Sequence, residues 1–336
     1  MSAAEPAVRL EEVTKSFGRH TAVDRLGLEI PRGVVYGLLG PNGSGKTTTL
    51  RMIMGILRPD RGRVRLFGSD PDRVRRERVG YLPEERGLYR KMKVLDVLLF
   101  LAEIRGVPAA VGRARARAWL ERLGLAGWEG RRVEDLSKGM QQKVQFIGTI
   151  LHEPDLLVLD EPFSGLDPLN QDVLEEIVRG FRAAGTTVLF STHLMDQAER
   201  LCERVCLISG ARKVLDGELA ALKARERRGV LAVEFEGDDR WLAGPEVAGI
   251  EGEAGRVHLL LHRGADPRAV LRRGVAAGAH VRRFEVVEPS LHEIFVRHAG
   301  ADAGAEDGTG QEAGTGRAVT GGVEATGPLA SEPEGG

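Results

Sequence analysis

The sequence lacks any long apolar run and any recognisable leader segment. Its longest uninterrupted apolar stretch is 97–102, whereas a membrane-spanning helix needs roughly 18 or more apolar residues in a row. The N-terminus, MSAAEPAVRLEEV, has neither the basic segment nor the apolar segment of a signal peptide. We therefore expect a soluble, cytoplasmic chain, for which any membrane role comes through a partner.

Cysteine is scarce as well, with only Cys202 and Cys206 in 336 residues. Two thiols do not build a disulfide framework. Their i,i+4 spacing would suit two metal ligands on one helix face, but no further Cys or His stands nearby at ligand spacing. We interpret both as small core residues in a reducing compartment.

The chain has no excess of charge of either sign. Charged residues make up 29% of the sequence, yet the net charge is −1. This balance disfavours nucleic acid or an anionic membrane surface as a partner. The arginine-rich stretch 112–123, GRARARAWLERL, is interpreted as the solvated side of a helix. We predict no nucleic-acid partner.

Short apolar stretches alternate with helix-like patterns over most of the chain. Continuous apolar runs at 34–40, 155–162 and 186–193 are typical of buried strands. Segment 94–125 is predicted to be helical, with a break near Pro108. This order predicts an α/β fold whose sheet is covered on both faces.

The composition divides the chain into three parts. Segment 7–226 carries the α/β pattern, and 229–298 has the strand and helix patterns of a small α+β domain. From residue 299 the composition collapses into Gly, Ala, Thr and Glu, which cannot bury enough apolar area to offset the entropy of ordering. We predict domains at 7–226 and 229–298, followed by a disordered tail at 299–336.

One glycine-rich loop carries a phosphate-binding pattern. Residues 40–47, GPNGSGKT, match G-x-x-x-x-G-K-[ST] between a predicted strand and a predicted helix. Small residues let several backbone N–H groups approach a polyphosphate, and the N-terminus of the helix adds its positive dipole end. Lys46 would neutralise the terminal phosphates, and the Thr47 hydroxyl would ligate Mg²⁺. The predicted nucleotide contacts are Gly40, Pro41, Asn42, Gly43, Ser44, Gly45, Lys46, Thr47 and Thr48.

Two acids end the apolar run LLVLDEP. Asp160 and Glu161 are placed at the carboxyl end of a buried strand, which is the end where α/β sheets bind ligands. Asp160 could hold Mg²⁺, directly or through water. Glu161 could take a proton from a water that attacks the γ-phosphate.

Three further motifs follow in a fixed order. LSKGMQQKVQ spans 136–145, SGLDP spans 164–168, and STH ends at His193. With the phosphate loop and the acid pair, the sequence resembles the ATP-binding-cassette (ABC) family of ATPases over about 7–222. The resemblance implies a P-loop NTPase domain of ABC type with a helical subdomain, and ATP and Mg²⁺ as cofactors.

The resemblance also implies roles for individual residues. Phe17 would stack on adenine, and His193 would contact the γ-phosphate. Asp167 would lie in the turn that crosses a dimer interface. The signature motif, which begins at Leu136, would contact the γ-phosphate of nucleotide held by the opposite subunit through Ser137, Lys138, Gly139 and Met140. A homodimer would therefore enclose the nucleotides.

The sequence departs from the commonest family pattern at two places. The signature reads Leu-Ser-Lys-Gly-Met in place of Leu-Ser-Gly-Gly-Gln, which keeps Ser137 and Gly139. In YLPEERGLY, residues 81–89, Glu84 stands where the family usually has the Gln that contacts Mg²⁺ and the attacking water. We expect Glu84 to serve as a metal ligand and to act beside the attacking water.

A particular branch of the family is indicated by YLPEERGLY and by PSLHEIF at 289–295. Both resemble the sodium-extrusion and drug-efflux ATPase subunits, whose permease, of ABC-2 type, is a separate chain. The resemblance implies that 85–105 contacts that permease at the inner face of the cell membrane. Two alternatives remain: a soluble ABC ATPase acting on ribosomes or DNA, disfavoured by the single phosphate loop and the short 50–136 segment, and an importer subunit. A GTPase is disfavoured because no Asn-Lys-x-Asp motif is present.

Overall fold

The computed structural model describes residues 5–85, 87–226, 229–253, 255–262 and 264–303. The predicted disordered tail overlaps the end of the last helix at 299–303, and its remainder, 304–336, lies outside the described residues. Within the described ranges, the helices are too short or too polar to span a lipid bilayer.

The largest sheet has six strands in the order β5-β6-β7-β3-β8-β9. Its strands run parallel except β9, which is antiparallel to β8. The bounds are β3 Val35–Leu39, β5 Val79–Leu82, β6 Leu156–Asp160, β7 Thr187–Thr192, β8 Arg204–Ser209 and β9 Arg212–Glu218. The three apolar runs predicted as buried strands form β3, β6 and β7, in which every residue is buried.

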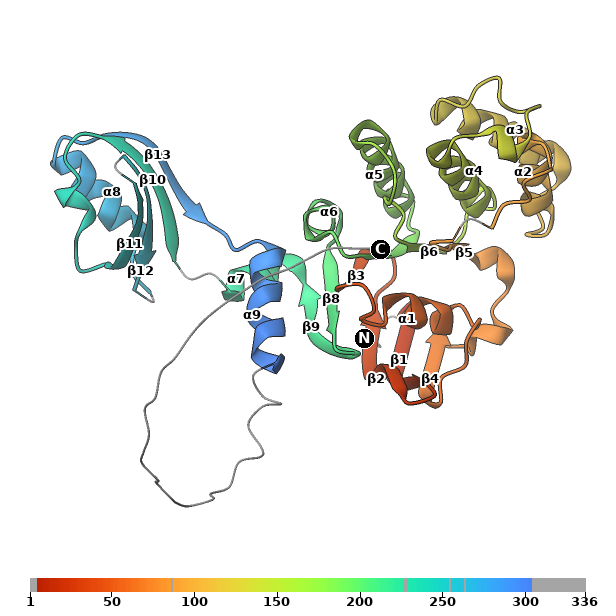
Figure 1. Cartoon of the computed structure of the whole chain (residues 1–336), viewed down its shortest axis with the longest axis horizontal. Coiled ribbons are helices and arrows are strands. Elements are labelled where there is room, and N and C mark those ends of the chain that lie inside the picture. The colour runs from red at the N-terminus through yellow and green to blue at the C-terminus, as the bar shows by residue number, and fades with distance from the viewer. Residues whose placement is uncertain (1–4, 86, 227–228, 254, 263, 304–336) are drawn as a thin grey trace, which may run out of the picture. The chain divides into compact units, whose positions relative to one another are not determined.

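Both faces of this sheet are covered, which explains the continuous apolar runs. Alternate residues of a strand point to opposite faces. In β3, Val35 and Leu39 pack with the helices α2 to α6, whereas Tyr36 and Leu38 pack with α1 and a second sheet (Figure 1). The helix bounds are α1 Lys46–Ile53, α2 Val94–Glu103, α3 Ala109–Arg122, α4 Lys138–Ile150, α5 Pro168–Ala183, α6 Met195–Leu201 and α7 Leu219–Glu226.

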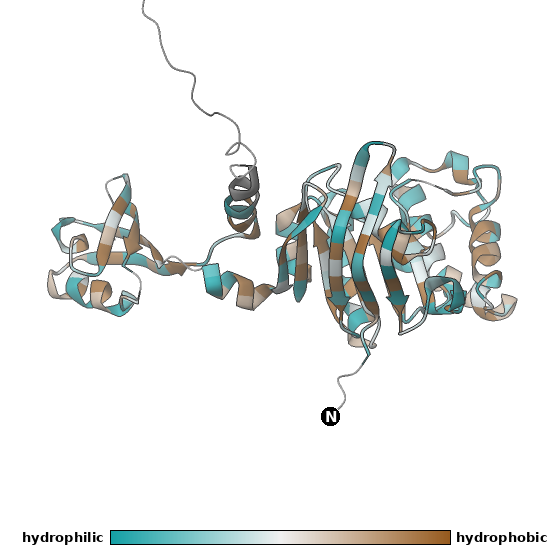
Figure 2. Ribbon diagram, turned by 90° about the horizontal axis from the view of Figure 1, so that it is seen from below, coloured by the Kyte–Doolittle hydropathy of each residue, from teal (hydrophilic) through white to brown (hydrophobic). Residues whose placement is uncertain are grey.

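The second sheet is antiparallel, with strands in the order β2-β1-β4. Its strands are β1 Val8–Phe17, β2 His20–Ile30 and β4 Arg61–Leu66. Hydrophobic and hydrophilic residues alternate along them (Figure 2), because one face packs on α1 while the other is open to solvent. Phe17, at the end of β1, lines one pocket together with residues of the predicted phosphate loop.

The predicted break in the helical segment 94–125 is confirmed. The segment forms α2 and α3, and Pro108 stands at the N-terminal boundary of α3, after Gly106 at φ +77°. The described residues also include four short 3₁₀ helices, at Pro71–Arg73, Arg76–Arg78, Val133–Asp135 and Arg240–Leu242.

Residues 230–287 form a four-stranded antiparallel sheet in the order β11-β12-β10-β13. The strands are β10 Val230–Glu236, β11 Val247–Glu253, β12 Arg256–Leu261 and β13 His280–Val287, with helix α8 at Pro267–Ala276. Leu231, Val233 and Leu259 pack with Val270 of α8 in a core of their own. The last helix, α9 Leu291–Ala303, instead places Ile294 in the same buried cluster as the central sheet.

The interpretation of the cysteines as core residues is confirmed. Cys202 and Cys206 are buried and free. Burial raises the pKa of both thiols, so they are protonated and poor ligands at neutral pH. Among the described residues, no group of three or more His, Cys, Asp or Glu forms a metal site.

Candidate active site

The phosphate loop joins β3 to α1 and depends on glycine at two positions. Gly40 has φ +153° and Gly45 has φ +103°. A Cβ on Gly40 would lie 2.2 Å from the carbonyl oxygen of Ile208, and one on Gly45 would lie 2.2 Å from that of Ala22. No side chain caps the N-terminus of α1, so its first N–H groups are available to an anion.

Lys46 is held inside this loop by backbone oxygens. Its ammonium donates to the carbonyl oxygens of Gly40 at 2.8 Å and of Pro41 at 3.1 Å, and Nζ lies 3.7 Å from Oε1 of Glu161. Burial lowers the pKa of Lys46, while the carboxylates of Glu161 and Asp160 act in the opposite direction. The loop therefore presents a fixed positive charge beside the acid pair.

Asp160 and Thr47 meet at the end of β6. The Thr47 hydroxyl donates to Oδ1 of Asp160 at 3.2 Å, and the Ser191 hydroxyl donates to the same oxygen at 2.5 Å. Burial raises the pKa of Asp160, and these two hydrogen bonds oppose that rise. Its other oxygen, Oδ2, is buried with no hydrogen-bond partner among the described residues. A hydroxyl beside a carboxylate with a spare oxygen fits Mg²⁺, which takes few protein ligands and fills its shell with water and phosphate.

Glu161 is fixed by its backbone as well as by its side chain. Its φ is +47°, a conformation that non-glycine residues rarely adopt. Its N–H donates to the Ser191 hydroxyl at 3.1 Å, and Nδ1 of His193 donates to Oε1 at 3.0 Å. The carboxylate is thus buried and held in one orientation by its contacts with His193 and Lys46.

A pocket of about 400 Å³ lies over this machinery. It brings together several predicted residues, including Phe17 from β1, Lys46 and Thr47 from α1, and Glu84 and Glu161. Phe17 is 49% exposed, as a stacking surface for a base requires. The full lining is Phe17, His20, Ala22, Asn42, Gly43, Gly45, Lys46, Thr47, Thr48, Glu84 and Glu161.

Comparison with known proteins identifies the family. A family model described as "ABC transporter" matches residues 23–164. The uncharacterized ABC transporter ATP-binding protein YhaQ of Bacillus subtilis (strain 168) is 41% identical over 293 residues, which cover 87% of this chain and 98% of that protein. This chain belongs to the ABC transporter ATP-binding proteins.

The C-terminal part of this ABC protein matches a second family model, described as "ATP-binding protein DrrA1-3-like, C-terminal domain", over residues 217–299. The daunorubicin/doxorubicin resistance ATP-binding protein DrrA of Streptomyces peucetius is 34% identical over 314 residues, 88% of this chain and 93% of that protein. The Nod factor export ATP-binding protein I of Paraburkholderia xenovorans (strain LB400) is 42% identical over 225 residues, 66% of this chain and 74% of that protein. These matches confirm the predicted ABC-type α/β fold, the ATPase function and the resemblance to the drug-efflux branch, whereas the domain boundaries stay a prediction.

The signature residues of this ABC ATPase do not line the pocket of their own chain. Ser137 caps α4, accepting from the N–H of Met140 at 3.3 Å, and Lys138 and Gly139 follow in its first turn. Asp167 caps α5, accepting from the N–H of Asn170 at 2.9 Å. Their predicted contact with nucleotide on an opposite subunit stays a prediction.

Sequence reasoning missed three residues that the structure adds to the site. His20 and Ala22, from β2, line the pocket, and Ser191 hydrogen-bonds both acids. Ser191 opens the STH motif, so its place beside Asp160 and Glu161 could have been inferred from the neighbouring strands. Nothing local in β2 marks His20 or Ala22.

Proposed function

We propose that this chain is the ATP-hydrolysing subunit of an ABC exporter, working at the inner face of the cell membrane on a separate ABC-2 type permease. The observation that carries the proposal is the alignment with DrrA over 93% of that protein's length, together with the matching C-terminal domain at 217–299. The Nod factor relative is named for export, which supports the same direction of transport.

The chemistry proposed is attack of water on the γ-phosphorus of ATP. Glu161 accepts the proton of that water as the bond to the leaving ADP oxygen breaks. His193 keeps Oε1 of Glu161 in place, and the ammonium of Lys46 balances the phosphate charge. Thr47, Asp160 and Glu84 would hold Mg²⁺, which neutralises charge on the phosphate oxygens when bound.

We further propose that ATP holds two chains together. Within one chain, the phosphate loop would contact only one side of the bound phosphates, because the N-terminus of α4 does not line the pocket. A second chain would bring Ser137 and Gly139, at the positive end of its own α4, to the γ-phosphate. Hydrolysis removes that phosphate contact, so the ATP-bound and ADP-bound states differ in dimer affinity.

The permease surface proposed is a cavity of about 160 Å³ lined mainly by the predicted segment 85–105 and by α4. Tyr89 lines this cavity and is 53% exposed, and its ring meets the ring of Phe100, which is 38% exposed, edge to face at 5.5 Å. Inside, Nε2 of His152 donates to the Val79 carbonyl at 3.2 Å, while its Nδ1 has no partner among the described residues. Burial lowers the pKa of His152 to about 4, so at neutral pH Nδ1 is an acceptor.

Removing the Tyr89 and Phe100 rings tests this surface. The double variant Tyr89→Ala/Phe100→Ala is expected to lower retention of the proposed ABC-2 type permease by about tenfold or more, because buried aromatics dominate interface energies. Co-purification from detergent-solubilised membranes measures it. Val111→Ala removes another exposed apolar side chain and is expected to retain the permease. Equal retention by both variants would contradict the proposed surface.

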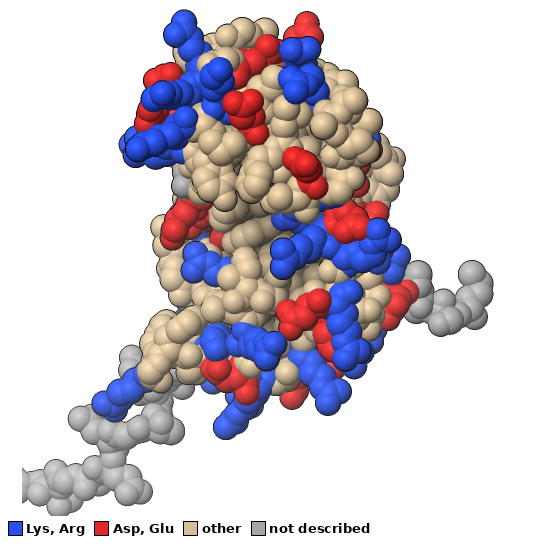
Figure 3. Space-filling view, turned by 90° about the vertical axis from the view of Figure 1, so that its right-hand side faces the viewer, with Lys and Arg blue, Asp and Glu red and all other residues tan. Residues whose placement is uncertain are grey.

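A nucleic-acid partner is not proposed. Figure 3 shows Lys and Arg interspersed with Asp and Glu over one face of the molecule. Several of the arginines are paired locally, as in Arg58–Asp72 at 3.3 Å and Arg78–Asp155 at 2.6 Å. Such pairing offsets the positive charge that a surface needs in order to follow a phosphate backbone.

A further inference from the structure

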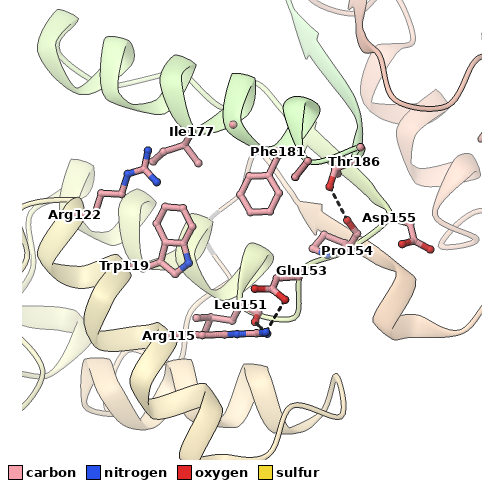
Figure 4. Close-up of a pocket in the computed structure, with 13 residues that line it drawn as sticks. Arg115, Trp119, Arg122, Leu151, Glu153, Pro154, Asp155, Ile177, Phe181 and Thr186 are labelled. Carbon is pink, nitrogen blue, oxygen red and sulfur yellow. Dashed lines mark hydrogen bonds and ion pairs between the residues drawn. The ribbon is translucent and has the colours of Figure 1, made fainter.

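A third cavity, of about 530 Å³, lies between α3 and the C-terminal half of α5 (Figure 4). Its floor is the turn between α4 and β6, from Leu151 to Asp155. It shares no lining residue with the nucleotide pocket. Its volume is in the range of about 300–1,000 Å³ that small-molecule sites occupy.

Two aromatic rings from different helices form the apolar wall of this cavity. Trp119 of α3 and Phe181 of α5 are near parallel, at 14°, with ring centroids 6.2 Å apart, and Figure 4 shows them side by side. Ile177 and Leu151 extend the same wall. A flat apolar group of a ligand would pack on this surface by stacking and burial.

The charges around the cavity leave one group without a counter-ion. Glu153 is bonded by Arg115 at 2.5 Å, and Asp155 is paired with Arg78 at 2.6 Å. Arg122 lies over the Trp119 ring at 5.1 Å and makes no ion pair with a described residue. The cavity therefore pairs a flat apolar wall with one guanidinium that lacks an acid.

Small residues in α5 and directly after its end keep this space open. Gly180, Ala184 and Gly185 line the cavity, and a Cβ built on Gly180 would meet no atom within 4 Å. A glycine inside a helix costs about 0.5–1 kcal/mol relative to alanine, so local stability does not account for it. The opposite side is braced by Arg115, which donates to the Leu151 carbonyl at 2.8 Å.

We propose that this cavity binds a planar aromatic anion. The ring system lies on the wall formed by Trp119 and Phe181, and the carboxylate, sulfonate or phosphate of the ligand pairs with Arg122. An exposed guanidinium that lies over an indole ring is suited to both parts of such a molecule. The site is independent of the nucleotide pocket and of the proposed permease surface.

Two probes that share a ring system but differ in charge test the proposal. 8-Anilinonaphthalene-1-sulfonate carries an anionic group, and N-phenyl-1-naphthylamine lacks it. With the full-length chain in saturating ADP, which fills the nucleotide pocket, the sulfonate is expected to bind at one site per chain and about tenfold more tightly than the neutral probe. Probe fluorescence measures both affinities.

Three variants decide where the probes bind. Arg122→Gln is expected to remove the tenfold preference and leave neutral-probe affinity unchanged. Gly180→Leu fills the cavity and is expected to weaken both probes by about tenfold or more, with the basal ATPase rate retained. Arg113→Gln, on the exposed side of the same helix, is expected to behave as the parent chain. If Arg122→Gln keeps the parent preference for the sulfonate, or a folded Gly180→Leu keeps parent affinities, the site is not this cavity. Should Gly180→Leu fail to fold, the Arg122→Gln comparison alone decides.

Discussion

Replacing Glu161 with glutamine is expected to lower the ATPase rate of the purified chain by about 10²-fold or more, with ATP affinity unchanged. The amide keeps an oxygen for the hydrogen bond from His193, which is 3.0 Å from Oε1 in the parent chain, but it cannot accept the proton of the attacking water. Phosphate release and equilibrium binding of a fluorescent ATP analogue measure the two quantities.

The matched control for this variant is Glu176→Gln, which removes an exposed carboxylate of α5. It is expected to hydrolyse ATP at the parent rate. A parent rate in Glu161→Gln would mean that another group, such as Glu84, takes the proton. The His193 contact would then be structural.

Replacing Lys46 with alanine is expected to raise the dissociation constant for ATP by about 10²-fold or more, because the triphosphate loses a buried counter-charge. The variant also frees the carbonyls of Gly40 and Pro41 and leaves Glu161 without its neighbouring cation. Isothermal titration with ATP and Mg²⁺ gives the affinity, and thermal unfolding reports whether the loop remains folded.

Lys213→Ala serves as the control for Lys46→Ala. Lys213 lies on β9, where it is paired with Asp216 at 3.1 Å, and it does not line the nucleotide pocket. It is expected to leave ATP affinity unchanged. Parent affinity in a folded Lys46→Ala chain would remove the assignment of residues 40–47 as the phosphate loop.

The sequence could predict the parts of the site that are built from neighbouring residues. The conformation of the loop GPNGSGKT is determined by its own residues. Gly40 and Gly45 are required there because their φ angles are positive and backbone oxygens lie where a Cβ would be. The strands β3, β6 and β7 are buried on both faces, so their apolar runs are unbroken and easily detected. The acids at the end of β6 lie near the loop because β6 and β3 are parallel strands of the same sheet, so their carboxyl ends are at the same edge.

The parts that could not be predicted depend on contacts between distant segments. His20 and Ala22 enter the pocket because the antiparallel sheet folds β2 over the loop. The apolar positions of α9 indicate an amphipathic helix, but not that Ile294 packs in the cluster of the central sheet. The cavity beside Trp119 arises where α3 and α5 approach each other, and no pattern within either helix indicates it.

We expect two copies of the chain to close around ATP and Mg²⁺, each supplying Ser137 to the other. Sedimentation of Glu161→Gln with saturating ATP and Mg²⁺, alone and with the detergent-solubilised permease, tests it most directly. We predict the mass of a dimer of this chain with ATP and of a monomer with ADP. A chain that stays monomeric in ATP, both alone and with the permease, would contradict it.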